Sequence, residues 1–279
     1  MKPILARAER ATLARFARGR LLVAFDYDGT LAPIVGNPAR AGMRASTRAL
    51  LRRVTALYPC VVISGRSRRD LLTRLRGLGV TQAIGSHGGD PSPRPRELRA
   101  RVGRWRASLA RRLRGLAGVT IEDKGLSLAV HFRRAPDRGR AHEAIRAAAS
   151  RLARARVVGG KCVVNVVARG APHKGAALAA ERRRLRCDTT LYVGDDETDE
   201  DVFSLPGRRQ LGIRVGLMPG SRARYYLRSQ RQVDSLLETL IRLRASRPRS
   251  RLSAARAGRA PAARRAARPR RQRARSASG

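Results

Sequence analysis

Residues 21–33, LLVAFDYDGTLAP, constrain the fold more than any other segment of the chain. Five uncharged apolar residues at 21–25 are followed at once by two aspartates, Asp26 and Asp28, that are separated by a single residue. An apolar run of this length is typical of a buried parallel strand, and open α/β sheets bind ligands beyond the carboxyl ends of their strands. The segment therefore predicts an α/β fold, mainly parallel, with an acidic site at the sheet edge.

The aspartate pair indicates a cation site. Residues two apart on a strand point the same way, and Gly29 permits a sharp turn that brings Asp28 back toward Asp26. Two crowded carboxylates repel each other unless a cation lies between them. Oxygen ligands suit Mg²⁺, and no nearby cysteine or histidine favours zinc. An ordinary polar turn after a strand is the alternative interpretation.

A second acidic segment follows another apolar run. The run covers residues 190–193, and residues 194–201, GDDETDED, hold six of the chain's twenty acidic residues. Because this segment also follows a buried strand, the two acidic strand ends would converge if their strands were neighbours. A solvated acidic loop is the alternative.

The remaining pattern places other polar groups at strand ends. An apolar strand at 60–63 precedes Ser64, Gly65 and Arg66, whose hydroxyl and backbone amides suit an anion. A short strand at 82–84 runs into a glycine-flanked His87. The helix that opens with Lys174 resumes the α/β alternation, and a last helix covers 233–243. These polar strand ends add an anion-binding candidate to the predicted acidic site.

Between these parts the pattern changes. Residues 91–171 predict a helix, two strands, a second helix and two more strands, which is a self-contained α+β module inserted as a cap. We therefore expect a core domain in two parts, 1–90 and 172–244, separated by this cap. Residues 245–279 contain no acid and consist of Arg, Ala, Ser, Pro, Gly, Gln and one Leu, which predicts a disordered basic tail.

The formal net charge of +42 comes almost entirely from arginine, since only four residues are lysines. This preference is typical of an arginine-favouring coding bias, although such a field attracts polyanions whatever its origin. A basic nucleic-acid-binding protein is therefore the alternative from a different class. The four Phe, five Tyr and one Trp offer few surfaces for stacking on bases, so we expect no specific nucleic-acid partner and only non-specific polyanion contact by the tail.

Cysteine usage and hydropathy indicate the compartment. Cys60, Cys162 and Cys187 lie far apart without metal-type spacing, which favours reduced core thiols over disulfides. No stretch approaches the roughly 20 apolar residues that a membrane span needs. No secretory-type apolar segment follows the basic N-terminal residues. We expect a cytoplasmic protein without a membrane span, and a monomer.

Taken together, the motifs point to a family. DYDGT, the serine of SGR, Lys174 and GDDETDED occur in the order of the haloacid dehalogenase (HAD) superfamily motifs, and the chain resembles that superfamily. More narrowly, FDYDGTLAPI, VVISGR, GSHG, IEDK, KGAAL and GDDETDEDVF resemble the trehalose-6-phosphate phosphatase family over roughly residues 20–243. The resemblance implies a HAD-like doubly wound sheet with an inserted cap. It also implies Mg²⁺-dependent hydrolysis of trehalose 6-phosphate to trehalose and phosphate through an aspartyl-phosphate, in trehalose biosynthesis.

The resemblance also implies roles for single residues. Asp26 would be the nucleophile, Asp28 the general acid and then the base, and Ser64 and Lys174 would hold the phosphoryl oxygens. Mg²⁺ would be held by Asp26, the backbone carbonyl of Asp28 and Asp195, with Asp196 or Asp199 reaching it directly or through water. The residues expected to contact the sugar phosphate are Asp26, Tyr27, Asp28, Gly65, Arg66, His87, Glu122, Lys124 and Asn165.

Two positions depart from the family pattern. Asp90 follows the HG pair where the family has a glutamate, and Asn165 stands where a glutamate is expected in GGKCVVNVV. Because a hydroxyl-recognising site discriminates only when its polar groups match the substrate, both departures concern disaccharide recognition rather than the chemistry. The alternative within the class is a related phosphatase acting on sucrose phosphate or a mannosyl phosphate.

Overall fold

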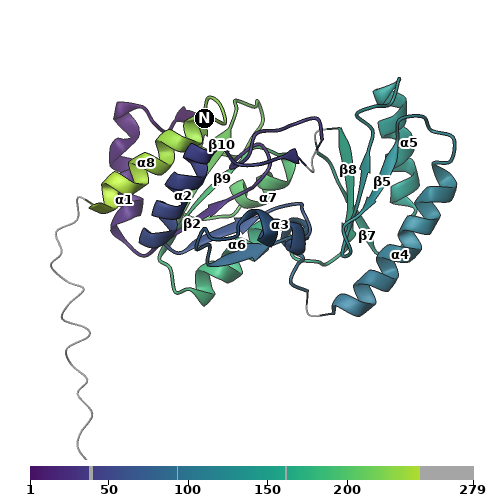
Figure 1. The fold of residues 1–279 in the computed structure, drawn as a ribbon, viewed down its shortest axis with the longest axis horizontal. Helices are drawn as coiled ribbons and strands as arrows, with labels where there is room; N and C mark the ends of the chain where they lie inside the picture. Colours follow the sequence, from purple (N-terminus) through teal and green to yellow (C-terminus); the bar gives the residue numbers. More distant parts are fainter. Residues whose placement is uncertain (38–39, 93, 161, 246–279) are drawn as a thin grey trace, which may run out of the picture. The chain divides into compact units, whose positions relative to one another are not determined.

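The computed structural model describes residues 1–37, 40–92, 94–160 and 162–245, so the predicted tail lies outside the described residues except for Ala245. Its main sheet has seven strands, and every neighbouring pair is parallel. The strand order is β1 (Lys2–Pro3), β11 (Tyr225–Leu227), β10 (Gln210–Val215), β9 (Thr189–Gly194), β2 (Leu21–Phe25), β3 (Cys60–Ile63) and β4 (Gln82–Ile84). The predicted α/β class with a parallel sheet is confirmed (Figure 1).

The two strands that precede the acidic segments are neighbours. Strands β2 and β9 pair in parallel with Phe25 opposite Val193. The backbone N–H of Asp26 continues this pairing and donates to the carbonyl of Val193 at 2.9 Å. Because both chains leave the sheet at the same edge, the acidic segments begin side by side, as the sequence predicted.

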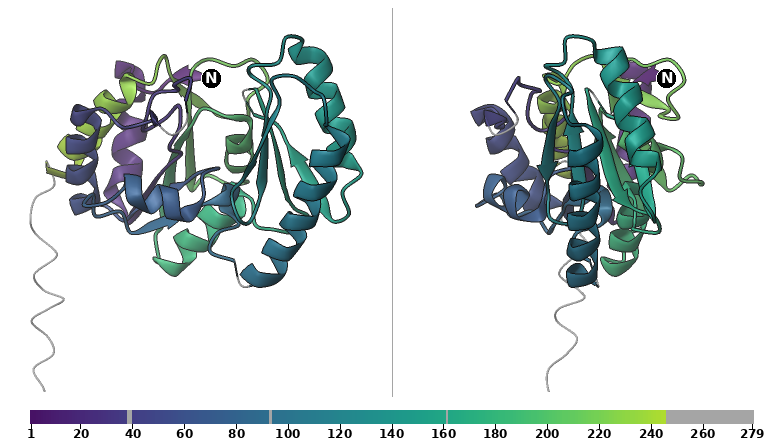
Figure 2. Two further views of the ribbon diagram at one scale, coloured as in Figure 1. Left: turned by 45° about the vertical axis from the view of Figure 1, so that its right-hand side comes forward. Right: turned by 90° about the vertical axis from the view of Figure 1, so that its right-hand side faces the viewer.

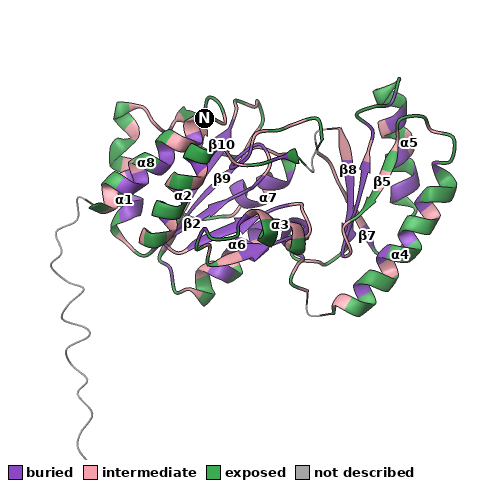
Figure 3. Cartoon of the chain, in the orientation of Figure 1, coloured by how far each residue is buried: buried purple, intermediate pink, exposed green. Residues whose placement is uncertain are grey.

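Helices cover both faces of this sheet, and the strand residues alternate between them. One face buries Val23 and Phe25 under α1 (Arg10–Arg18), α2 (Ala45–Leu57), α3 (Arg68–Arg74) and α8 (Gln232–Ala245). The opposite face buries Leu22 and Ala24 under α6 (Lys174–Arg184) and α7 (Glu200–Phe203). In Figure 3 the central strands β2, β9 and β10 are buried along nearly their whole length, whereas the helices are buried along one side only. The core is therefore double-sided, which explains why its strands are continuously apolar rather than alternating.

A second sheet lies between β4 and α6 in the chain. It is antiparallel, in the order β5 (Thr120–Asp123), β6 (Leu128–His131), β8 (Val163–Ala168) and β7 (Ala155–Val158). Helices α4 (Pro95–Arg112) and α5 (Arg138–Ser150) pack together on one of its faces (Figures 1 and 2). This order of elements is the predicted cap pattern, while the boundaries at residues 91 and 171 stay a prediction.

Short elements account for most differences from the predicted pattern. The sequence pattern missed β1 and β11, because strands of two and three residues carry no usable periodicity. It also missed the short 3₁₀ turns η1 (Arg7–Glu9), η3 (Ser86–Gly88) and η4 (Glu197–Asp199). None of the helices in the described part of the chain has the length and apolar character that crossing a bilayer requires.

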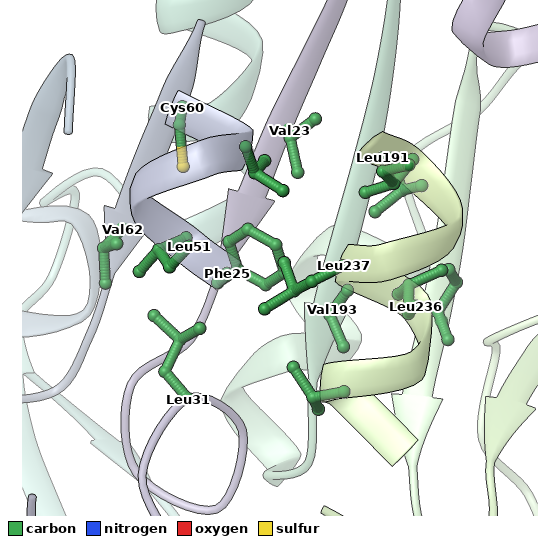
Figure 4. Close-up of a cluster of buried hydrophobic side chains, with 14 of the residues drawn as sticks. Val23, Phe25, Leu31, Leu51, Cys60, Val62, Leu191, Val193, Leu236 and Leu237 are labelled. Carbon is green, nitrogen blue, oxygen red and sulfur yellow. The ribbon is translucent and has the colours of Figure 1, made fainter. Parts of the chain in front are cut away.

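Leu237 on α8 provides a test of how much the main core contributes to stability. Its side chain is fully buried beside Phe25 and Leu51 in the close-up of Figure 4. Leu237→Ala leaves a cavity, and we expect it to lower the free energy of unfolding by about 2–5 kcal/mol in urea denaturation. The control is Leu72→Ala, whose side chain is 46% exposed, with an expected change within about 0.5 kcal/mol. Equal losses in the two variants would contradict this assignment of the core.

Candidate active site

Three carboxylates meet at the carboxyl edge of the main sheet. Asp26 follows β2, Asp195 follows β9, and Asp199 ends the 3₁₀ turn η4. One carboxylate oxygen of each lies within 4.8 Å of the others. Oxygen ligands at this spacing fit a hard divalent cation. The convergence that the sequence predicted is therefore present, and it forms an acidic metal-binding cluster.

A glycine makes this approach possible. Gly29 has φ +78, and a Cβ atom there would lie 2.0 Å from Oδ2 of Asp195. Any other residue would push the turn after β2 away from the second acidic segment. Thr30, the next residue, donates its hydroxyl to Oδ1 of Asp195 at 3.3 Å. The DGT part of the motif thus supplies Asp28 and also positions Asp195 of the second acidic segment.

Lys174 links the two acidic segments. It is the first residue of α6, and only 1% of it is exposed. Its Nζ lies 3.1 Å from Oδ2 of Asp26 and 2.7 Å from Oδ1 of Asp199. Burial alone would lower the pKa of Lys174, but the charges of Asp199 and Asp26 reverse this effect and raise it. The ammonium is therefore charged, and its desolvation is compensated by two buried carboxylates.

Both carboxylate oxygens of Asp199 accept hydrogen bonds. In addition to Lys174, its Oδ1 accepts from the hydroxyl of Tyr192 at 2.6 Å. Its Oδ2 accepts from the backbone N–H of Asp196 at 2.8 Å. Tyr192 was not predicted as a site residue. The available signal was a phenol placed two residues before Gly194 in an otherwise apolar strand.

The cluster carries more negative charge than Lys174 can balance. Burial and, to a lesser extent, the charges of neighbouring carboxylates raise the pKa of Asp26 well above its usual range and that of Asp195 to about 7. Without a cation, such carboxyl groups take up protons more readily than usual, and a bound divalent cation would replace those protons. Asp196 lies outside the three-carboxylate group found among the described residues, and its side chain caps η4. A direct metal contact by Asp196 therefore stays a prediction.

The side chain of Asp28 is held by Arg66 in a bidentate ion pair. The guanidinium donates from Nε at 2.7 Å and from Nη2 at 2.6 Å, and its Nη1 donates to Asp70 at 2.7 Å. Asp70, on α3, also accepts from Nε of Arg74 at 3.0 Å. The carboxylate for which the family resemblance implies acid–base chemistry thus has a cationic partner. Neither Asp70 nor Arg74 was predicted, because their role depends on how α3 packs beside the turn.

Three further predicted residues lie near this pair. Tyr27 is 1% exposed and belongs to the core, with its ring centroid 5.4 Å from the Arg66 guanidinium carbon. Ser64 is buried at the end of β3 and lines the cleft described below. A Cβ at Gly65 would lie 2.5 Å from Cε1 of His87, so glycine lets the imidazole approach the chain. The SGR segment therefore shapes the site through its glycine as well as its hydroxyl.

His87 is buried in a left-handed conformation with φ 58. Burial lowers the pKa of His87 well below its usual value, and the charges of Lys124 and Lys174 lower it further, while Asn165 partly offsets this effect. Among the described residues no well-formed hydrogen bond reaches either ring nitrogen. A neutral imidazole with free ring nitrogens can donate to or accept from a bound ligand.

A cleft of about 970 Å³ contains most of the predicted residues. From the main sheet it is lined by Asp26, Asp28, Ser64, Gly65, Arg66, His87, Lys174, Asp195 and Asp196, and from the second sheet by Glu122, Lys124 and Asn165. Tyr27 and Asp199 are not part of this lining within the described chain. A hydrogen bond of 2.8 Å from His131 lowers the pKa of Glu122, and burial lowers that of Lys124. The lining combines acids, cations and an amide, as a phosphorylated polar ligand requires.

The family model for trehalose-phosphatase matches residues 24–230. The chain belongs to this family. The trehalose-phosphatases belong to the HAD superfamily and are phosphoric monoester hydrolases. The chain is therefore an enzyme of that class. The predicted family and enzyme class are thereby confirmed.

Individual relatives agree with this assignment. Probable trehalose-phosphate phosphatase 9 of Oryza sativa subsp. japonica is 31% identical over 269 residues, covering 82% of this chain and 72% of the rice protein. Trehalose-phosphate phosphatase of Mycolicibacterium paratuberculosis is 38% identical over 197 residues, covering 65% of this chain and 50% of that protein. The C-terminal domain of C. albicans trehalose-6-phosphate phosphatase superposes with a TM-score of 0.71 at 24% identity, covering 88% of this chain and 98% of that chain. This last likeness shows the shared fold.

Asp195 makes the stability of the metal-free protein depend on pH. Its pKa of about 7 exceeds the usual value of 3.8, so between these values the folded state binds more protons than the unfolded state. The contribution of Asp195 to the free energy of unfolding therefore falls as pH rises from about 4 to about 7. We expect wild-type protein in EDTA to lose more stability between about pH 5 and about pH 7.5 than Asp195→Asn does, measured by urea unfolding.

The control for this prediction is Asp137→Asn, an exposed N-cap of α5 at which asparagine serves equally well. It should keep the wild-type pH dependence. The same pH dependence in wild type and Asp195→Asn would contradict the prediction.

Proposed function

We propose that this protein is a Mg²⁺-dependent phosphatase that hydrolyses trehalose 6-phosphate to trehalose and phosphate, in trehalose biosynthesis. One observation carries the proposal: the carboxylate of Asp26 lies in the cleft 3.1 Å from the Lys174 ammonium, within the group formed with Asp195 and Asp199. Phosphoryl transfer needs a nucleophile placed among cations in this way. The names of the rice and mycobacterial relatives support the substrate.

In the first step, a carboxylate oxygen of Asp26 attacks phosphorus. The bond between Asp26 and phosphorus forms as the bond from phosphorus to the sugar oxygen breaks, and Asp28 gives its proton to that oxygen. In the second step, Asp28 takes a proton from water, whose oxygen attacks the aspartyl-phosphate. Phosphate leaves and Asp26 is regenerated, so two carboxylates one residue apart perform both half-reactions.

The ion pair between Arg66 and Asp28 constrains the order of these reaction steps. Both oxygens of Asp28 accept from the guanidinium, so this pair has to open before Asp28 can carry a proton. The phosphoryl oxygens of the substrate are alternative acceptors of the same bidentate geometry. Substrate binding would therefore free Asp28, which would then take up a proton from solvent and could give it to the sugar oxygen.

The other polar groups hold the transferring phosphoryl group. Lys174 and the Ser64 hydroxyl would donate to its oxygens. Mg²⁺ would be held by Asp26, the backbone carbonyl of Asp28 and Asp195, with Asp196 or Asp199 directly or through water. When bound, it would neutralise negative charge on the carboxylates and on the phosphoryl oxygens.

Sugar recognition would come from the second sheet. Glu122, Lys124 and Asn165 would bind hydroxyl groups, together with His87 from the turn after β4. Asn165 is 3% exposed and can both donate and accept, whereas the glutamate expected from the resemblance can only accept. This one residue favours, as the alternative, another sugar phosphate such as sucrose phosphate or a mannosyl phosphate.

Replacing the nucleophile tests the chemistry. Asp26→Asn keeps the shape of the side chain but removes the charge that attacks phosphorus, so we expect no measurable Mg²⁺-dependent phosphate release from a folded protein. Folding is checked by circular dichroism, and Asp137→Asn serves as the matched control with wild-type turnover. Substantial activity in Asp26→Asn would exclude Asp26 as the nucleophile.

A substrate panel tests the specificity. We expect phosphate release with Mg²⁺ to be fastest from trehalose 6-phosphate, slower from sucrose 6-phosphate, glucose 6-phosphate and mannosyl phosphates, and absent in EDTA. Asn165→Glu should raise kcat/KM for trehalose 6-phosphate relative to glucose 6-phosphate, because the added carboxylate accepts from a sugar hydroxyl.

Comparable low rates on every compound would keep the reaction class but refute trehalose 6-phosphate as the substrate. An equal change in kcat/KM for both substrates in Asn165→Glu would show that residue 165 does not contact the second sugar.

A further inference from the structure

The acidic segment after β9 has a cationic support behind it. Arg214 forms the last pair in the register between β10 and β9, where it lies opposite Gly194, the residue before the acids. It is 6% exposed and is the one arginine among the buried residues in the described part of the chain. A buried guanidinium is costly unless its donors are paired, so its partners show what it is for.

Two of these partners are backbone carbonyls of the acidic segment. Nη2 of Arg214 donates to the carbonyl of Asp195 at 2.6 Å, and Nη1 donates to the carbonyl of Asp196 at 3.2 Å. The side chains of these aspartates lie on the cleft, while their carbonyls are drawn toward β10. The planar guanidinium thus fixes two successive peptide groups at once, which a single-point donor cannot do.

The third partner, Glu200, holds the guanidinium in place. Its Oε1 accepts from Nη1 of Arg214 at 2.9 Å and from the hydroxyl of Ser221 at 2.7 Å. Its Oε2 accepts from the backbone N–H of Arg222 at 2.8 Å. With three donors, this carboxylate has little freedom to move. The loop after β10 therefore anchors Glu200, Glu200 anchors Arg214, and Arg214 anchors the acidic segment.

We propose that Arg214 and Glu200 are positioning residues that set the affinity of the site for its divalent cation by fixing the backbone of Asp195 and Asp196. Neither side chain belongs to the carboxylate group or to the cleft lining among the described residues. They act through Asp195, whose carboxylate must stay near Asp26 and Asp199 although all three repel one another. This inference rests on the metal site of the proposed function.

The physical reason is the cost of holding like charges together. Without Arg214, the carbonyls of Asp195 and Asp196 would lose this donor and Glu200 would lose one of its three, and the segment would move to reach water. Such a movement lets the Asp195 carboxylate withdraw from the other two. Loss of a residue that orients metal ligands typically weakens metal binding by about 10- to 100-fold.

The test is direct Mg²⁺ binding by calorimetry with the full-length protein, with no substrate present. We expect Arg214→Met, which keeps the length of the side chain without its donors, to raise the Kd for Mg²⁺ by about 10- to 100-fold. Arg214→Lys should also raise the Kd, because one ammonium cannot reach both carbonyls and Glu200 in the planar arrangement. The increase should be smaller than in Arg214→Met, because lysine keeps a charged donor. Glu200→Gln should also give a smaller increase, since the amide oxygen still accepts from Arg214.

Arg244→Met is the matched control. Its guanidinium also donates to backbone carbonyls, those of Leu57, Ala17 and Gly19, but between α8 and other elements away from the acids. We expect it to lower the melting temperature in EDTA and to leave the Kd for Mg²⁺ at the wild-type value. The control thereby separates a loss of stability from a loss of metal-site geometry.

A wild-type Kd in Arg214→Met would overturn the inference while leaving the proposed function intact. If Arg214→Met does not fold, wild-type Kd values in both Arg214→Lys and Glu200→Gln would overturn it equally. Absence of Mg²⁺ binding by the wild-type protein would overturn the inference and the proposed function together.

Discussion

The buried ammonium of Lys174 is the interaction on which the site depends. It joins a carboxylate from the end of β2 to one from the 3₁₀ turn after β9, with only 1% of the lysine exposed. Because Lys174 also begins α6, this one charge fixes the helix to two neighbouring strands. Without it, Asp26 and Asp199 would be forced together with no compensating charge. Under the proposed function, the same ammonium would also balance the charge of a transferring phosphoryl group.

Around this centre, the supporting contacts come from regular structure more than from long loops. Tyr192 and Arg214 lie on adjacent strands and hold opposite parts of the acidic segment. Asp70, on α3, holds the arginine that in turn holds Asp28. Rigid elements keep reactive groups in place better than loops do. The other side of the cleft, by contrast, is lined by residues of a separate antiparallel sheet.

The sequence predicted much of this arrangement, because a buried parallel strand and an acid at its end are local signals. The bounds of β2, β3 and β4 match the predicted ones, and the two acidic segments lie together as expected. What the sequence could not show is which distant residue faces which acid. Arg214 and Tyr192 resemble ordinary strand residues until the strand order places them beside the acidic segment. Such pairings depend on tertiary packing, which periodicity alone does not contain.

The two edges of the main sheet have a consequence for the behaviour of the protein at high concentration. The edge strands, β1 and β4, have two and three residues, and Pro3 in β1 has no backbone N–H to offer. Long, flat edges recruit strands from other molecules, whereas short edges interrupted by proline offer almost nothing to pair with. The net charge of +42 adds repulsion between copies. A continuously apolar parallel sheet is thereby shielded from intermolecular strand pairing and the aggregation that follows from it.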